Sequence, residues 1–235
     1  MAITRLAINA LQSARARRET YIGPWLPEPV DTSADPHLGA ERAEALELAV
    51  LLLMERLSAN ERAAYVLREA FDYPYSQIAD ILQSSEDAVR QLVSRARKHV
   101  TGERRARVAA GDQHRLLSAF VNAARSGELP ALEELFAADV VSLADSNGTV
   151  RAASRMPIVG ATRLATVVRA FAASHFWDGV DVQWASTNGQ PSALLVRDGE
   201  VFAVLATSAS AEGIDQVLWL MNPAKLAGAS RAATA

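Results

Sequence analysis

The chain has 235 residues, of which half are hydrophobic and 22% are charged, a composition typical of soluble globular proteins with buried cores. It contains no cysteine, which excludes disulfides, thiol catalysis and cysteine-ligated zinc, and it has no apolar run long enough to span a bilayer. The net charge is −3, but basic residues gather locally, and local charge governs binding to a polyanion more than the total does. These features predict a cytoplasmic protein of about two domains, with no membrane partner, metal or cofactor.

The first half of the chain is predicted to be helical. Residues 3–19 have helical composition and are followed by the proline-rich stretch YIGPWLPEP and a polar loop. A helix is expected over residues 40–57, and Ser58 with Glu61 three residues later makes a capping box for the next helix. A short helix, SQIADIL, then leads through the turn QSS into a long basic helix that begins near Ser85.

The short helix, the tight turn and the longer basic helix predict a helix-turn-helix unit, whose second helix lies in the major groove of DNA. Apolar side chains at helical spacing between Val89 and Val100 are expected to face the core. Arg90 suits guanine and Gln91 suits adenine by bidentate geometry, whereas other basic side chains fit phosphates. The alternative is a helical hairpin with a solvated basic face. The expected DNA-binding residues are Ser85, Glu86, Asp87, Arg90, Gln91, Ser94, Arg95, Arg97 and Lys98.

After Gly111 the pattern changes to an α+β domain. Two helices split at residues 127–130 are followed by VVSLADSNG, which alternates like a strand that ends in a turn. MPIVGATRLATVVRAFAAS is expected to be a further helix. From Val180 on, four β-rich runs are separated by the hairpin-type turns NGQP, RDGE and SAEG. The second half is therefore predicted to place helices against a curved antiparallel sheet.

The helical half resembles region 4 of an extracytoplasmic-function (ECF) sigma factor. The shared features are an L-S-x-x-E-R opening, Y-x-x-I-A-x-I-L before the turn, and S-x-x-x-V-R-x-x-V-x-R-A-R in the recognition helix. The resemblance implies binding of promoter DNA at the −35 element and docking on the β-flap of the RNA polymerase core. The chain departs from the family at Gln83, a turn position that is often glycine, and at Leu92, where a basic residue is common.

The stretch SARARRETYIGPWLPEP resembles the junction in the ECF subgroup whose sigma regions are fused to a SnoaL-like C-terminal domain. There W-L-P-E-P connects region 2 to region 4, so the chain would start at the end of region 2, as a fragment or through a late start. Such a chain should not initiate transcription by itself. The domains implied are 1–20, the last helix of region 2; 21–39, a proline-rich linker; 40–108, region 4; 112–226, the SnoaL-like domain; and 227–235, a flexible tail.

Residues 112–226 resemble the cone-shaped SnoaL-like or ketosteroid-isomerase-like fold, whose cavity is the default site for a small apolar ligand. Two short motifs of the subgroup, linked to control of the sigma regions by the fused domain, are matched in part. One is the turn that begins at Asp145, and the other is N-P-D-K-L, here with Ala224 in the third position. The expected regulatory residues are Trp25, Leu26, Pro27, Asp145, Gly148, Asn222, Pro223, Lys225 and Leu226.

The prolines of YIGPWLPEP would hold an extended backbone that loses little entropy when it docks. Trp25 and Leu26 would then be buried against a neighbouring surface, which the resemblance suggests is the SnoaL-like domain. The stretch is therefore predicted to make an intramolecular contact and to act as a latch between modules, with the fused domain in place of a separate anti-sigma protein.

Two other functions fit the residues less well. A ligand-responsive helix-turn-helix regulator that never touches polymerase would carry the same basic helix. An enzyme of the ketosteroid-isomerase type would need a carboxylate base and an oxyanion donor such as tyrosine, yet no tyrosine follows Tyr75. We therefore expect a sigma factor without enzymatic activity. The polar candidates for a cavity mouth, each better explained by turn chemistry or a surface position, are Asp139, Asp145, His175, Asp178 and Trp184.

Overall fold

The computed structural model describes residues 3–6, 8, 21–32, 48–55, 57–102, 108–151, 153–226 and 229. Some predictions concern residues outside these ranges: the helix over residues 9–19, the loop and the start of the helix over 33–47, and most of the tail. The chain forms two compact units. One contains Met1–Thr20 and Val50–Arg104, and the other contains Tyr21–Ala49 and Arg105–Ala235. The proline-rich stretch therefore belongs to the second unit, although the residues before it belong to the first.

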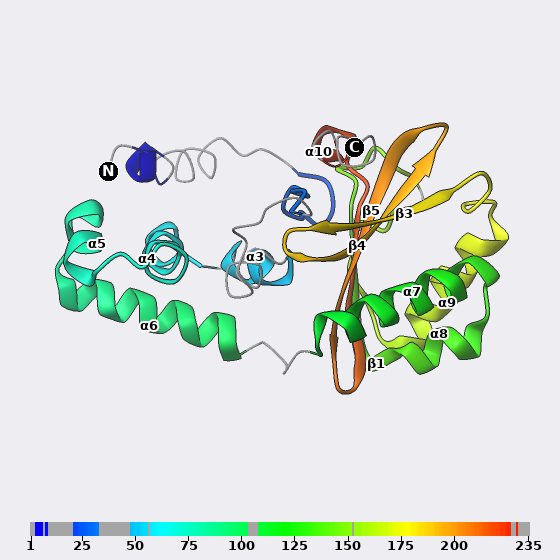
Figure 1. The fold of residues 1–235 in the computed structure, drawn as a ribbon, viewed down its shortest axis with the longest axis horizontal. Helices are drawn as coiled ribbons and strands as arrows, with labels where there is room; N and C mark the ends of the chain where they lie inside the picture. The colour runs from blue at the N-terminus through cyan, green and yellow to red at the C-terminus, as the bar shows by residue number, and fades with distance from the viewer. Residues whose placement is uncertain are drawn as a thin grey trace. The chain divides into compact units, whose positions relative to one another are not determined.

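The helices of the first unit follow the sequence pattern closely. They are α3 (Leu48–Glu55), α4 (Ala59–Glu69), α5 (Tyr75–Leu82) and α6 (Glu86–Gly102) (Figure 1). The predicted capping box at the start of α4 is confirmed: the Ser58 hydroxyl accepts a hydrogen bond from Glu61 N at 3.3 Å, and the Glu61 carboxylate accepts one from Ser58 N at 3.1 Å. Ser85 caps α6 in the same way by accepting from Ala88 N at 3.2 Å. None of the described helices is long and apolar enough to cross a membrane.

The tight turn between α5 and α6 is made at Gln83. This residue takes the left-handed conformation, with φ at 52°, which glycine adopts more readily than residues with a side chain. On the inner side of the turn, Ile78, Val89 and Val93 are buried together with Ala64 of α4. The side chain of Val100 lies outside the described set. Helices α5 and α6 thus form the predicted helix-turn-helix, and α4 packs against both.

The second unit packs three helices on one face of a sheet (Figure 1). These helices are α7 (Ala110–Ser126), α8 (Leu129–Leu135) and α9 (Ala161–Ala173), and a short helix, α10 (Pro223–Leu226), follows the last strand. The predicted split between the first two helices is confirmed, because Gly127 ends α7 in the left-handed region. The core between helices and sheet includes Leu117, Phe120, Leu132, Leu205 and Trp219.

The sheet has six strands in the order β2-β1-β6-β5-β4-β3. Their bounds are β1 (Phe136–Asp145), β2 (Ile158–Val159), β3 (Asp181–Thr187), β4 (Gln190–Arg197), β5 (Glu200–Ser210) and β6 (Gly213–Leu220). The hairpins from β3 to β6 are antiparallel as predicted. β1, however, pairs with β6 in parallel, so the sheet is mixed. The reason is that the chain leaves β1 and crosses through β2 and α9 before the hairpins bring β6 back beside it.

The helix predicted to begin near Met156 starts later, at Ala161. Ile158 and Val159 form the edge strand β2 instead, paired with β1, and Gly160 with φ at 97° turns the chain into α9. β-Branched side chains after a proline favour the extended conformation, which outweighs the helical pattern at this point.

Candidate functional site

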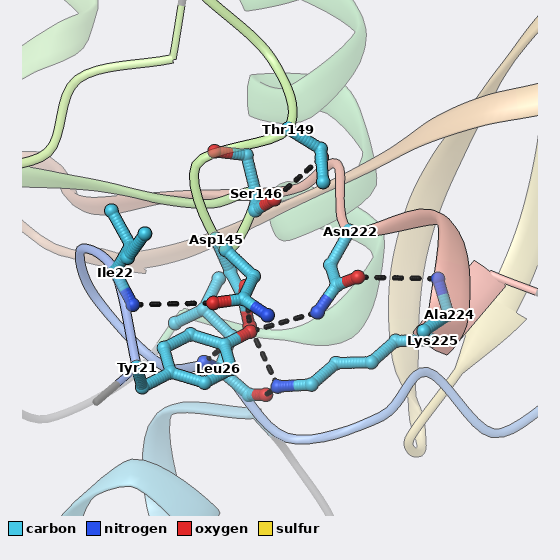
Figure 2. Close-up of polar contacts among 10 residues, drawn as sticks. Tyr21, Ile22, Leu26, Asp145, Ser146, Thr149, Asn222, Ala224 and Lys225 are labelled. Atoms are coloured by element: carbon cyan, nitrogen blue, oxygen red, sulfur yellow. Dashed lines mark hydrogen bonds and ion pairs between the residues drawn. The ribbon is translucent and has the colours of Figure 1, made fainter. Parts of the chain in front are cut away.

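Asp145 organises a cluster of polar contacts at the end of β1 (Figure 2). Its side chain is fully buried, and Oδ2 lies 2.7 Å from Lys225 Nζ and accepts a hydrogen bond from Leu26 N at 2.8 Å. The Tyr21 hydroxyl donates to the other oxygen, Oδ1. A buried carboxylate is costly unless it is paired and hydrogen-bonded, and here it receives donors on both oxygens.

Lys225 extends from α10 over the proline-rich stretch, as Figure 2 shows. Besides Asp145, its ammonium donates to Leu26 O. It also lies 4.2 Å from the centroid of the Trp25 ring and 5.0 Å from that of the Tyr21 ring, within the range of cation–π attraction. One ammonium therefore contacts a carboxylate, a carbonyl and two aromatic faces.

Asn222 connects the end of β6 to the same cluster. Its Nδ2 donates to the Tyr21 hydroxyl at 2.9 Å, while its Oδ1 accepts from Ala224 N at 3.1 Å and so caps the turn into α10. Met221 N donates to Asp145 O at 2.7 Å, which fixes this segment beside the end of β1. The strand register, with Asp145 opposite Leu220, brings the two sequence motifs together.

Burial raises the pKa of Tyr21 to about 12, and the hydrogen bond to Asp145 acts in the same direction. The hydroxyl therefore stays protonated at neutral pH, as it must to donate to the carboxylate. Together these contacts of Tyr21–Leu26 with Asp145, Asn222 and Lys225 are called the first anchor below.

Gly148 is required by the close approach of Ile22. It has φ at 74°, and a Cβ at this position would lie 3.0 Å from Ile22 Cγ2. The neighbouring Asn147 accepts a hydrogen bond from Ile22 N at 3.2 Å. A glycine in this turn therefore lets the proline-rich stretch lie against it.

A second anchor holds residues 28–32 at the β3–β4 turn. Asn188 exchanges two hydrogen bonds with Val30: Asn188 N donates to Val30 O at 2.8 Å, and Asn188 Oδ1 accepts from Val30 N at 3.0 Å. Asn188 Nδ2 also donates to Glu28 O at 3.3 Å. Thr32 N donates to Ser186 O at 2.9 Å, so the stretch continues the sheet beyond β3. The sequence does not predict this anchor, because Asn188 and its neighbouring glycine have the pattern of an ordinary hairpin turn.

The predicted regulatory residues at the first anchor differ in their burial. Leu26 and Pro27 are buried, as is Leu226 of α10, while Pro223 is exposed at the start of that helix. The expected burial of Trp25 needs correction: its side chain is 40% exposed. The Lys225 ammonium lies over its ring, so the indole is in contact with the anchor without being enclosed by it.

The predicted DNA-binding residues lie on α6 or directly before it, and all are exposed except Glu86, which is half-buried at the end of the face that carries Val89 and Val93. The exposed ridge opposite the core has the i, i+4, i+7, i+11 spacing of one helix face. Arg90 and Arg97 flank this ridge on one side, and Arg95 flanks it on the other. The ridge consists of Asp87, Gln91, Ser94 and Lys98.

Each of the three arginines of this surface is paired with a glutamate. Arg90 pairs with Glu86 one turn earlier. The other two pairs tie α6 to α4: Arg95 Nε is 2.9 Å from Glu61 Oε1, and Arg97 Nη2 is 2.8 Å from Glu69 Oε1. The remaining cation, Lys98, has no acidic partner among the described residues.

The pKa values of this surface reflect the pairs. The hydrogen bond to Glu69 raises the pKa of Arg97. The Ser58 hydroxyl, with a smaller contribution from Arg95, lowers the pKa of Glu61. The lowered pKa keeps Glu61 ionised at neutral pH, and both glutamates compete with any anion for the arginines.

The polar candidates for an enzymatic site are not brought together. His175 Nδ1 and Asp178 Oδ2 lie 2.9 Å apart on the surface, Asp139 is exposed, and Trp184 is half exposed with its ring against His114. None of them lines the apolar cavity of this unit. That cavity has a volume of only about 30 Å³, roughly the room of one water molecule, and its lining includes Ser142, Ile158, Phe171, Phe176 and Trp219.

Comparison with known proteins defines the class. Residues 47–100 match the family model for sigma-70, region 4. The chain is 38% identical over 160 residues to the ECF RNA polymerase sigma factor SigJ of Mycobacterium tuberculosis, which covers 65% of the chain and 51% of SigJ. It is also 32% identical over 229 residues to the protein named "Probable ECF RNA polymerase sigma factor SigI" of the same species, which covers 95% of the chain and 75% of SigI.

The crystal structure of SigJ from Mycobacterium tuberculosis superposes with a TM-score of 0.72 and 28% identity, over 89% of the chain and 76% of that chain. The helical unit is therefore a sigma region 4, and it precedes a SnoaL-like α+β domain as the sequence predicted. The protein belongs to the family of ECF RNA polymerase sigma factors. The chain spans about half the length of SigJ and three quarters of that of SigI.

Proposed function

We propose that the first unit directs RNA polymerase to promoters by reading the −35 element through α6, and that the second unit controls this activity through residues 21–32. One observation carries the proposal: the region 4 match of a chain that belongs to the ECF sigma factors contains α4, α5 and all but the last two residues of α6. The protein would act with RNA polymerase in the cytoplasm, as a regulator rather than an enzyme.

The ridge of α6 supports direct reading of bases. Gln91 stands at its centre with an amide that can bond adenine in the major groove, and Arg90 beside it can bond the two acceptors of guanine. Asp87, nearer the start of the helix, can accept from cytosine. Lys98, further along the helix, is placed for a phosphate, which gives affinity without sequence information.

Binding of DNA would require arginines of α6 to exchange their glutamate partners for phosphates. Arg95 and Arg97 can turn all their N–H donors to phosphates only if Glu61 and Glu69 release them. Exposed pairs of this kind contribute about 0–1 kcal/mol to stability, so the exchange is feasible, but it lowers the net gain from each arginine. Sequence preference would then depend mainly on the ridge and Arg90.

Control by the second unit rests on how the chain is anchored. Residues 1–20 belong to the first unit, and the next residues, from Tyr21 to Thr32, are held by the second unit at both ends. A change that opens the first or second anchor would therefore release a segment that is joined directly, through the chain, to residues 1–20 of the first unit. The fused domain would take the place of a separate anti-sigma protein.

Binding to the polymerase β-flap and selection of DNA test the proposal together. An immobilised β-flap domain should retain the full chain. The full chain should also enrich a −35-like motif from a pool of duplexes with a randomised central stretch. Enrichment without β-flap binding would favour the alternative of a helix-turn-helix regulator that acts apart from polymerase. Failure to enrich any motif would contradict promoter recognition itself.

A further inference from the structure

Tyr75, the first residue of α5, lies against arginines from both other helices of the motif. The guanidinium carbon of Arg90 is 4.7 Å from the centroid of the Tyr75 ring, and that of Arg68 is 5.0 Å from it. At these distances the negative face of an aromatic ring attracts a cation. One ring thus joins α4, α5 and α6 at the point where the recognition helix begins.

The ring itself is held in place by the core. Tyr75 is partly buried and packs against the cluster that contains Ile78, Val89 and Val93. Arg68 is fixed further by donating to Tyr73 O at 3.1 Å. The aromatic face is therefore a rigid surface on which the two arginines rest.

Arg90 keeps its capacity to bind a ligand in this position. Its side chain is 55% exposed, and its polar contact is the ion pair with Glu86. A guanidinium carries five N–H donors in a fixed plane, so contact with one ring and one carboxylate leaves donors for the two acceptors of a guanine. Contact with the ring also limits the rotamers of a long side chain, which reduces the entropy lost on binding.

We propose that Tyr75 is a positioning residue for DNA recognition. Its ring holds Arg90 in the direction of the base edges and keeps Arg68, on α4, available for a phosphate next to the same base step. This inference rests on the proposed promoter-reading function and adds a residue outside the recognition helix to it. The aromatic face, and not the hydroxyl, performs the role.

Two substitutions separate the ring from the hydroxyl. Tyr75→Phe keeps the aromatic face, and Tyr75→Leu keeps an apolar side chain for the core but removes the face. Tyr73→Leu is the matched control, because it keeps the backbone carbonyl of Tyr73 that accepts a hydrogen bond from Arg68. Circular dichroism and thermal unfolding of the three variants test whether each one folds before binding is compared.

The first readout is selection of sequences from the randomised duplex pool by each full-length variant. We expect Tyr75→Phe and Tyr73→Leu to select the wild-type motif. Tyr75→Leu should lose preference, by about fivefold or more, at the same base position at which Arg90→Ala loses it. In the double variant Tyr75→Leu/Arg90→Ala the loss should not exceed that of Arg90→Ala alone. An unchanged motif with Tyr75→Leu, or additive losses, would overturn the inference.

The second readout needs no DNA and separates the two proposals. The ¹⁵N relaxation of Arg90 Nε should report an ordered side chain in the wild type and in Tyr75→Phe, and a mobile one in Tyr75→Leu. Equal order in all of them would show that the ring does not position Arg90, whatever DNA the protein selects. If the order depends on the ring but the wild type enriches no motif, the promoter-reading function is wrong, and with it the role of Tyr75 in recognition.

Discussion

The Lys225 ammonium and the Asp145 carboxylate form a buried ion pair at 2.7 Å, with side chains 9% and 0% exposed. Both charges also bind the same residue of the proline-rich stretch: Leu26 N donates to the carboxylate, and Leu26 O accepts from the ammonium. The pair therefore encloses one residue between β1 and α10. Opening the first anchor would leave both charges without these partners, which links the position of residues 21–32 to the integrity of the pair.

Asp145→Asn should release the first anchor. The substitution keeps the shape of the side chain but leaves the buried Lys225 ammonium without a counter-charge, and removing one partner of a buried pair costs about 3–5 kcal/mol. We expect a lower thermal unfolding temperature and faster proteolysis within residues 21–32. The control is Asp198→Asn, in an exposed left-handed turn position that asparagine also tolerates. Identical stability and cleavage in both variants would rule out the structural role given to Asp145.

Asn188→Gly should loosen the second anchor. Glycine keeps the left-handed turn, where φ is 54°, and removes the hydrogen bonds of the amide side chain to Val30 and Glu28. We expect a loss of about 1–2 kcal/mol in the free energy of unfolding and faster cleavage near residue 30. Asp198→Gly, in the next hairpin turn with the same φ, is the control. The prediction is wrong if the two variants are cleaved at the same rate.

The first anchor should weaken at high pH through Tyr21. The pKa of its hydroxyl rises from about 10 in the unfolded chain to about 12 in the fold. Between these values the folded state keeps a proton that the unfolded state has lost, so stability is full below pH 10 and falls as pH rises towards 12. The free energy of unfolding of Tyr21→Phe should therefore not fall with pH by this contribution. Parallel pH profiles for the two proteins would show that Tyr21 does not titrate as expected.

Lys98→Gln should weaken the binding of every duplex alike. A single phosphate contact contributes about one unit to the slope of the logarithm of the binding constant against the logarithm of the salt concentration. We therefore expect the slope to fall by about one while the selected motif stays the same. Arg115→Gln, on α7 of the second unit, serves as the control for a lost positive charge. A change of motif with Lys98→Gln would indicate base contact instead.

Glu69→Gln should strengthen DNA binding. The neutral amide releases Arg97, which now pairs with the Glu69 carboxylate at 2.8 Å, and so removes competition with phosphate. The gain should appear at low salt for all duplexes and vanish in the double variant Glu69→Gln/Arg97→Gln. Anisotropy titrations at several salt concentrations measure it. Weaker binding with Glu69→Gln would mean that the pair chiefly holds α6 in its binding orientation.

Local chemistry made the first unit predictable. The capping box needs only Ser58 and Glu61 at the right spacing, and the burial of Val89 and Val93 follows from helical periodicity. The glutamate partners of the arginines were not foreseen. Glu61 and Glu69 lie 34 and 28 residues away from Arg95 and Arg97 in the chain, and only packing of α4 on α6 brings them together.

Long-range pairing explains what the sequence did not predict in the second unit. The parallel contact of β1 with β6 depends on a crossover that no local pattern encodes. The same pairing places Asp145 beside the segment of Asn222 and Lys225, so the two motifs could be recognised but their contact could not be derived. Asn188 has an ordinary turn signal, and its second role appears only because Val30 reaches it across the fold.

Run-off transcription offers the most direct test of control by the second unit. A polypeptide in which a sigma region 2 is followed by this chain would be combined with core RNA polymerase, in parent, Asp145→Asn and Asp198→Asn versions at equal concentration. We expect Asp145→Asn to change the amount of product from a promoter with the selected −35 motif, and Asp198→Asn to match the parent. Equal product from all three, with residues 21–32 shown by proteolysis to be released in Asp145→Asn, would contradict control through the first anchor.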